Sequence, residues 1–461
     1  MFPVASQAFA SPPKRKRDIL PHYSPDLIWR KSDIPRVTSA FATELAAPLP
    51  SPPANELKNK VAKKTIKNNP HLFKVVTPIN VDRFEKLLKK HPNRPFVKSV
   101  CRGLRKGFWP WADTSDPNLP TTHDNSRRSV LSREKSKFIR EQRDEEVKLN
   151  RWSKPFGQKL LPGMYSAPIS AVPKRSGKFR LINDQSWGPN SLNSMIPKSK
   201  VNIPLDGIDH LGSALIAVRK KIGPNRKLVA FKSDVKSAYR LMPMHPLWQI
   251  RQAVNVDGKY HIDRCNTFGN RAGGWIFGSF MSLVLWIATE VKGLPDLFGY
   301  VDDDFSWEFK NKKRFYKPYN KDLPAKQAKY LELWDELRIP HEEPKQLFGP
   351  SLPIIGYDVD PNAMEVKVPT EKKAEVIKSI RTVAREGRFT LKQLQSMAGS
   401  VNVVLSIYPH LRPRLRSLFN EMAGKEEKAG TKICISRPTR HELLELADCL
   451  EHASGVPIQK L

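Results

Sequence analysis

Residues 297–309 read LFGYVDDDFSWEF, with three consecutive aspartates, Asp302, Asp303 and Asp304, inside an apolar and aromatic stretch. Aromatic residues alternate with other residues on both sides of the acids, which predicts a β-hairpin with the aspartates at its turn. Adjacent carboxylates in a buried turn repel one another and raise one another's pKa, and a divalent cation relieves that repulsion. An acidic surface turn is the simpler alternative, because aspartate-rich turns are common.

A metal site of this kind needs an acid from a second strand. Magnesium keeps part of its coordination shell for water and substrate phosphates, so two or three carboxylates suffice. Asp234 ends the apolar strand expected in KLVAFKSDVKSAY, residues 227–239, and is the partner acid we expect. A basic turn with Lys174 and Arg180 is suited to a triphosphate. The glycine-rich segment FGNRAGGWIFG, residues 268–278, lies between the two acid sites, where the backbone can approach a substrate closely.

The composition indicates a polyanionic partner. The 461 residues include 79 lysines and arginines against 46 acids, a formal charge of +33. Such an excess favours nucleic acid as the partner, although a basic tail on an ordinary domain is the alternative. The four cysteines form no CxxC pair, which argues against a disulfide framework or a zinc knuckle and fits a reducing compartment.

Membrane insertion is not expected. No secretory signal is apparent, and the longest near-apolar run, residues 275–288, has 14 residues. That run is too short to span a bilayer and predicts a core helix instead.

Composition and periodicity change along the chain. The proline-rich start predicts a disordered basic tail, and its cluster Lys14–Arg17 is either a nuclear localisation signal or a chance basic run. The residues before and after a strand-containing middle predict helices, including a solvated one near 138–152 and two later ones begun by Thr370 and Thr390. The segments we expect are 1–70 (tail), 71–159 (helical), 160–365 (strands and acid sites), 366–425 (helical) and 426–461 (start of a connection).

In this order the motifs resemble the reverse transcriptase domain. VPKRSGKFRLINDQS, residues 172–186, resembles the fingers hairpin, SDVKSAYRLMPMHP, residues 233–246, resembles motif A, and YVDD, residues 300–303, resembles the signature hairpin. The resemblance implies an α+β right-hand polymerase fold of fingers, palm and thumb, here with a basic, partly disordered N-terminal extension. It covers about residues 80–455.

The resemblance also implies roles for single residues around two Mg²⁺ ions, with Mn²⁺ as an alternative. Asp234 and Asp302 would be metal ligands and catalytic, Asp303 would complete the site, and the carbonyl of Val235 would add a ligand. Asp304 has no role in the family pattern.

Further positions match the nucleotide and primer contacts of the family. Lys174 and Arg180 would bind the phosphates of the incoming nucleotide, and Tyr239 would lie beneath its sugar, although a buried core tyrosine is the alternative. Phe268 and Gly269 would contact the template and nucleotide. Lys345 would protonate pyrophosphate or be a surface lysine. Gly356 would grip the primer end.

Two departures qualify the match. Gly273 and Gly274 stand where the family has Ala-Pro or Ser-Pro, which affects the wall beside the nucleotide but not the metal site. Family members usually continue into a ribonuclease H domain, for which we expect no room here.

His245, in the MHP of motif A, is expected to be structural.

The expected function is therefore an RNA-directed DNA polymerase of a retroelement. RLINDQSWGPNSLN, residues 180–193, and HPLWQ, residues 245–249, are most similar to DIRS-type (tyrosine-recombinase) elements. The partners would be an RNA or DNA template, a DNA primer and deoxynucleoside triphosphates, without a membrane, in the nucleus or cytoplasm. The oligomeric state stays open.

Three alternatives remain. A catalytically inactive, nucleic-acid-binding relic would bind template–primer without extending it. An RNA-dependent RNA polymerase shares the separated aspartates, but Tyr239 and the YVDD form argue against it. A basic scaffold protein gives no reason for the two acid sites to coexist.

Overall fold

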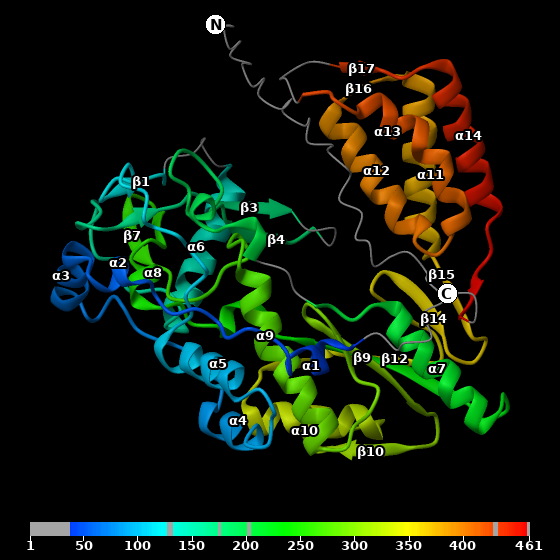
Figure 1. The fold of residues 1–461 in the computed structure, drawn as a ribbon, viewed down its shortest axis with the longest axis horizontal. Coiled ribbons are helices and arrows are strands. Elements are labelled where there is room, and N and C mark those ends of the chain that lie inside the picture. The colour runs from blue at the N-terminus through cyan, green and yellow to red at the C-terminus, as the bar shows by residue number, and fades with distance from the viewer. Residues whose placement is uncertain (1–36, 127–131, 174–176, 201–203, 427–431, 459–461) are drawn as a thin grey trace, which may run out of the picture. The chain divides into compact units, whose positions relative to one another are not determined.

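The computed structural model describes residues 37–126, 132–173, 177–200, 204–426 and 432–458 (Figure 1). By its internal contacts the chain divides into two units. Among the described residues, one unit consists of residues 37–365 and the other of residues 366–458. The two units are described separately below.

A four-stranded antiparallel sheet forms the centre of the first unit. Its order is β12 (His341–Gly349), β5 (Leu228–Val235), β9 (Asp303–Phe309) and β8 (Phe298–Tyr300). The apolar start of β5, from Leu228 to Phe231, is at most 8% exposed, as expected of an inner strand that is covered on both faces. Strands β5 and β9 are therefore rigid supports for the residues at their ends.

The hairpin predicted around the three aspartates is confirmed. Strands β8 and β9 pair in antiparallel register, and Val301, in the turn, has a positive φ of 61°. The polar residues that alternate with the aromatic ones are also buried, because α10 (Ala325–Leu337) covers their face of the sheet. Lys326 of α10 donates to Ser306 Oγ at 3.2 Å.

Helix α9 (Gly273–Trp286) is the apolar core helix that the sequence predicted. It continues as a π-helical turn, η5 (Ile287–Val291), so the whole helix has 19 residues and is long and apolar enough to cross a membrane. The helix is thus longer than the 14-residue apolar run, which alone is too short to span a bilayer, and 72% of its most apolar window is buried inside the protein. This burial is the pattern of a core helix.

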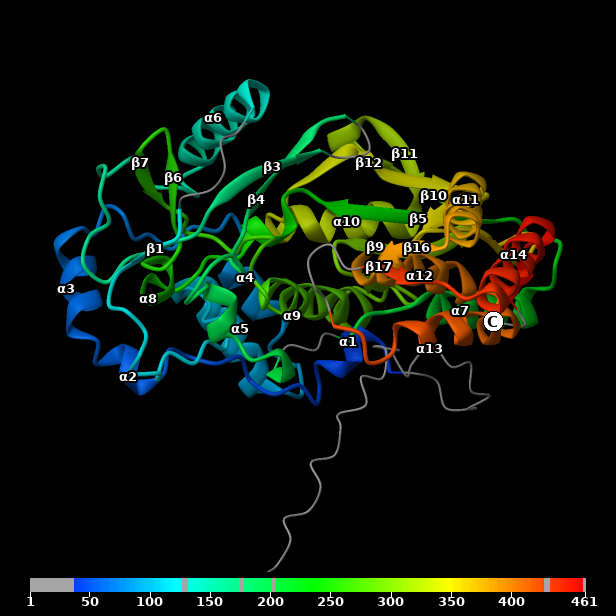
Figure 2. The ribbon, with the colours of Figure 1, turned by 90° about the horizontal axis from the view of Figure 1, so that it is seen from above.

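The prediction of a disordered tail is wrong for residues 37–70. These residues contain α1 (Ser39–Ala42), α2 (Ala54–Leu57) and α3 (Lys60–Asn68), and α1 lies against α9 in both ribbon views (Figures 1 and 2). Ala40, Leu49 and Ala62 are at most 4% exposed within the core. The scattered apolar residues therefore find long-range partners that composition does not reveal. The cluster Lys14–Arg17 lies outside the described residues.

The helical region before residue 160 also belongs to the first unit. Helices α4 (Val81–Leu87) and α5 (Arg94–Lys106) bury Phe84, Val97 and Leu104 in the same core as the central sheet. The segment boundary expected between residues 159 and 160 is therefore not a boundary of the core, because the core recruits apolar side chains from both sides of that position.

The two strands predicted around the basic turn are β3 (Ile169–Pro173) and β4 (Phe179–Asn183), which pair in antiparallel register. Helix α6 (Arg133–Lys148) packs on this hairpin; Figure 2 shows α6 beside it. As predicted, α6 is largely solvated, but Ile139 and Glu146 are buried.

The other elements of the first unit complete its periphery. They are β1 (His123–Asp124), β2 (Tyr165–Ser166), β6 (Ala253–Val256) and β7 (Lys259–Ile262), which form one sheet; α7 (Ile208–Ile222), α8 (Pro246–Gln249) and the 3₁₀ turns η2 (Leu192–Met195), η3 (Lys198–Lys200), η4 (Ala238–Leu241) and η6 (Lys317–Tyr319); and the hairpins β10 (Lys313–Tyr316)–β11 (Lys321–Pro324) and β13 (Leu352–Ile354)–β14 (Tyr357–Asp360).

The second unit is helical, as predicted. Helix α11 begins at Thr370, which is its first residue rather than its cap, and ends before Gly387, whose φ is +69°. The capping box of Thr390 and Gln393 is confirmed at the start of α12. The elements of this unit are α11 (Thr370–Glu386), β16 (Arg388–Thr390), α12 (Leu391–Leu405), η7 (Pro409–Leu415), α13 (Arg416–Met422), β17 (Lys432–Cys434), α14 (Arg437–His452) and β18 (Val456–Pro457), while β15 (Glu365–Lys367) spans the boundary.

Helix α14 corrects the expected boundary at residue 425. It packs on α11, and Leu443, Leu446 and Leu450 are fully buried. The residues expected to start a connection therefore complete this helical unit.

Candidate active site

The strand register brings the predicted acids together. Asp234, the second-last residue of β5, pairs with Asp303, the first residue of β9. The backbone N–H of Val235 donates to the carbonyl of Asp302 at 3.4 Å, so the turn residue lies beside the end of β5. Two adjacent inner strands thus place three carboxylates at one edge of the sheet.

The negative charges of these acids repel one another. Burial raises the pKa of Asp302, and the nearby Asp234 and Asp303 raise it further. Burial also raises the pKa of Asp303, although Lys232 opposes the shift. Both pKa shifts have the direction that the sequence predicted from repulsion between neighbouring carboxylates.

Two lysines partly neutralise the acids. Lys345 Nζ lies 2.7 Å from Asp234 Oδ1, and Lys232 Nζ lies 3.4 Å from Asp303 Oδ2. In the part of the chain that the structure describes, no group of three or more acidic, histidine or cysteine side chains has the arrangement of a metal site. Asp234, Asp302 and Asp303 nevertheless offer carboxylate oxygens, which are the donors that a hard divalent cation prefers.

Asp304 follows Asp303 in β9, so the two side chains point to opposite faces of the sheet. It is 1% exposed and accepts a hydrogen bond of 2.6 Å from the hydroxyl of Tyr330, on α10. Burial raises its pKa well above the usual value. Asp304 therefore attaches the hairpin to α10.

A cavity of about 350 Å³ connects Asp302 to several of the other predicted residues. Arg180 of β4, Phe268, Val235, Asp302 and Lys345 all line it. Arg180 and Phe268 are 88 positions apart in the sequence. They nevertheless share one site with the turn that carries Asp302. Lys174 lies outside the described residues.

An aromatic stack joins Tyr239 to this cavity. The ring of Tyr239 stacks on Phe268, with 4.9 Å between centroids and 28° between planes, and the guanidinium of Arg180 lies 5.4 Å from the Phe268 centroid. Burial, and then the charge of Asp302, raises the pKa of Tyr239. Phe268 is 46% exposed, so one side of the stack faces solvent.

Two glycines of the segment after β7 have distinct surroundings. A Cβ on Gly269 would lie 1.7 Å from the carbonyl oxygen of Asn183, which only glycine permits. Gly273 begins α9, and a Cβ there would lie 3.0 Å from the carbonyl oxygen of Thr267. The Gly-Gly pair therefore starts a helix directly behind the aromatic stack.

Gly356 and His245 lie in turns. Gly356 has a φ of +80° and follows Ile355, whose φ is +49°, in the two-residue turn between β13 and β14. This turn type needs left-handed residues. His245 caps α8 by accepting from the N–H of Leu247 at 3.2 Å, so its structural role is confirmed.

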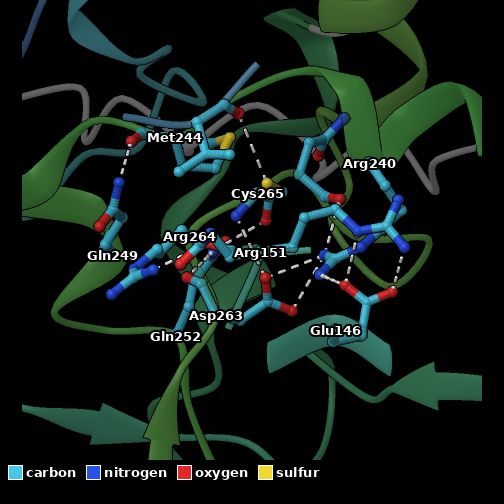
Figure 3. Close-up of polar contacts among 12 residues, drawn as sticks. Glu146, Arg151, Arg240, Met244, Gln249, Gln252, Asp263, Arg264 and Cys265 are labelled. Atoms are coloured by element: carbon cyan, nitrogen blue, oxygen red, sulfur yellow. Dashed lines mark hydrogen bonds and ion pairs between the residues drawn. The ribbon is translucent and has the colours of Figure 1, made fainter. Parts of the chain in front are cut away.

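A buried ion-pair network, which no sequence pattern indicated, also lines the cavity. It consists of Glu146 on α6, Arg151, Arg240 and Asp263 (Figure 3). The charge-rich composition of α6 indicated only a solvated helix, because ionic partners distant in the sequence leave no local pattern. The one available signal was that Arg240 directly follows Tyr239 in motif A.

No protein-family model and no curated protein matches this chain. Solved structures do match. The foamy viral protease–reverse transcriptase dRH in complex with double-stranded DNA is 17% identical, with a TM-score of 0.50 over 89% of this chain and 63% of that chain. The foamy viral enzyme in complex with an RNA/DNA hybrid is 16% identical, with a TM-score of 0.50 over 84% of this chain and 49% of that chain.

At this identity the likeness concerns the fold alone. The chain has the mixed helix and strand fold of these reverse transcriptase structures and spans less than two thirds of their length.

Proposed function

We propose that this protein is an RNA-directed DNA polymerase, a reverse transcriptase of a retroelement. The observation that carries the proposal is the register of β5 and β9, which places Asp234 opposite Asp303 beside the Asp302 turn. Asp302 lines the cavity that Arg180 and Phe268 also line. The shared fold of the foamy viral structures supports the same reading.

The reaction would be nucleotidyl transfer. The 3′-hydroxyl of a primer attacks the α-phosphate of a deoxynucleoside triphosphate, a new phosphodiester bond forms, and pyrophosphate leaves. Asp234, Asp302 and the carbonyl of Val235 would hold two Mg²⁺ ions, or Mn²⁺, with Asp303 completing the site. The ions would lower the pKa of the attacking hydroxyl and neutralise the leaving phosphates.

The proposed nucleotide contacts include Arg180 and Phe268, which line the cavity. Arg180, with Lys174, would bind the triphosphate, and Phe268 with Gly269 would form a wall beside the base. Tyr239 would lie beneath the sugar and clash with a 2′-hydroxyl. Lys345 would protonate pyrophosphate. Its ammonium group lies 2.7 Å from Asp234.

Nucleic acid is the partner that the charge and the fold support. The formal charge is +33, and the structures that share the fold hold double-stranded DNA or an RNA/DNA hybrid. Phosphate contacts of this kind depend little on sequence and weaken strongly with salt. Gly356 would contact the primer end. A DIRS-type origin and a nuclear or cytoplasmic location belong to the same proposal.

One observation favours the inactive relic as a second candidate. Lysines at 2.7 Å from Asp234 and 3.4 Å from Asp303 would let the acids remain paired without a metal. Such a protein would bind template–primer and leave the primer unextended.

A defined-sequence extension assay separates the two candidates. A labelled DNA primer is annealed to an RNA template, and each of the four deoxynucleotides is offered alone with Mg²⁺. We expect addition of the complementary nucleotide only, at every template position tested. Binding of template–primer without addition would favour the relic, and addition without regard to the template would contradict the proposal.

A further inference from the structure

The guanidinium of Arg240 is the centre of the buried ion-pair network that lines part of the cavity. Arg240 Nη2 lies 2.6 Å from Glu146 Oε2, and its Nη1 lies 2.9 Å from Asp263 Oδ1 (Figure 3). Arg151 approaches the other oxygen of Glu146 at 2.7 Å, and all four side chains are at most 12% exposed. Buried ion pairs add little net stability, because desolvation offsets their attraction. Their effect is therefore best sought in the geometry that they hold.

Arg240 holds both segments that carry the aromatic stack. It directly follows Tyr239 in η4 (Ala238–Leu241). Its Nη1 also donates to the carbonyl of Asn266 at 3.1 Å, two residues before Phe268. The two rings of the stack thus belong to segments that a single side chain ties together.

Glu146 reaches this arginine from a separate helix. Helix α6 is fixed by Ile139, which packs in a cluster with Trp152 and Ile169, and by Phe138, whose ring lies 5.5 Å from that of Phe179. Its position is therefore set by the hairpin that carries Arg180.

The charge of Glu146 is maintained inside the protein. Burial alone would raise its pKa, but Arg240 and Arg151 outweigh burial and lower it. An ionised carboxylate at this point balances two guanidinium groups and keeps Arg240 turned toward α6.

We infer that Glu146 is a positioning residue for sugar selection, because it holds Arg240 and thereby fixes Tyr239 against Phe268. The inference rests on the proposed function, in which Tyr239 lies beneath the sugar of the nucleotide. Without the carboxylate, Arg240 turns toward Asp263 alone, Tyr239 loses its fixed position, and a 2′-hydroxyl is admitted.

The test compares E146Q with D144N, a matched acid-to-amide change on α6. The side chain of Asp144 is 70% exposed, and its ion pair within the described part of the chain is with its neighbour Arg143. Single-turnover addition of dCTP and of CTP opposite a template guanine is measured for each protein. We expect the preference for dCTP to fall about tenfold in E146Q, equivalent to about 1.4 kcal/mol, and to stay at the wild-type value in D144N.

A double variant distinguishes positioning from general damage. If Glu146 acts through Tyr239, then E146Q causes no further loss of preference in the Y239A background, because the two changes are not additive. A further tenfold loss in that background would overturn the inference. So would an unchanged preference in E146Q.

A binding measurement separates this inference from the proposed function. The ratio of dCTP to CTP affinity is measured on template–primer with a 3′-dideoxy end, where no chemistry occurs. If the wild type binds nucleotide without extending an ordinary primer, the proposed function fails and the binding ratio still decides the inference. A wild type without preference for dCTP contradicts it.

If E146Q fails to fold, the preference for dCTP over CTP is measured in R240K instead. A lysine has no planar fork and cannot reach Glu146, Asp263 and the Asn266 carbonyl together. We expect the same loss of preference, and a wild-type ratio in R240K would overturn the inference.

Discussion

Replacing Gly269 with alanine inserts a methyl group where β4 meets the segment of Phe268. The new Cβ would lie 1.7 Å from the carbonyl oxygen of Asn183, whereas real contacts of this kind stay above 3.0 Å. The two backbones must therefore separate by at least about 1.3 Å. A misplacement of about 1 Å costs about 100-fold in rate when it affects substrate positioning, and overpacking costs about 1–3 kcal/mol of stability.

The assay is single-nucleotide incorporation on a primed template, with kcat/KM as the quantity compared. We expect G269A to lose about 100-fold, because Arg180 on β4 is displaced from Phe268. The matched control is G399A, since nothing lies within 4 Å of a Cβ added to Gly399 and alanine favours a helix interior by about 1 kcal/mol. A folded G269A protein with the kcat/KM of the wild type would refute the reasoning.

Three further predictions concern single side chains. K345Q should slow the chemical step about 100-fold, as expected for loss of a general acid, with nucleotide affinity unchanged; rapid-quench kinetics measure both, and an unchanged rate removes Lys345 from that role. Y330F should lower the free energy of unfolding by about 1–3 kcal/mol, because the buried carboxylate of Asp304 loses its hydrogen bond, and urea denaturation beside the wild type shows the difference. Burial lowers the pKa of His245 from 6.5 to about 4, so the stability it contributes is present above pH 6.5 and is lost as the pH falls toward 4, by about 3 kcal/mol. H245N keeps the cap without the titration and should lose less stability over that range; an equal loss in both proteins contradicts the shift.

The parts of the site that sequence could predict are those with a local signal. Alternating aromatic residues on both sides of Asp302 specify a hairpin, and an apolar run specifies the strand that ends at Asp234. The pairing of the two strands then follows from burial of both, because inner strands need neighbours on each edge. The capping box of Thr390 and Gln393 is local in the same sense.

The parts that sequence could not predict depend on long-range partners. Glu146 stands in a run of charged residues that is typical of a solvated helix, and its partner Arg240 lies 94 residues further along. Lys345 lies 111 residues from Asp234, with which it forms an ion pair, and only the family resemblance, not a local pattern, suggested it as a site residue. The N-terminal helices around Ala40 and Ala62 fold because a core is available, which proline-rich composition does not show.

The most direct test of the central claim is Mg²⁺-dependent extension of oligo-dT on poly-rA with dTTP. The wild type is compared with D302N and with D322N, a change at an exposed acid of β11. The account predicts extension by the wild type and D322N and none by D302N, with template–primer binding equal in all three. Equal extension by D302N, or binding without extension by the wild type, would contradict a nucleotidyl-transfer centre at these acids.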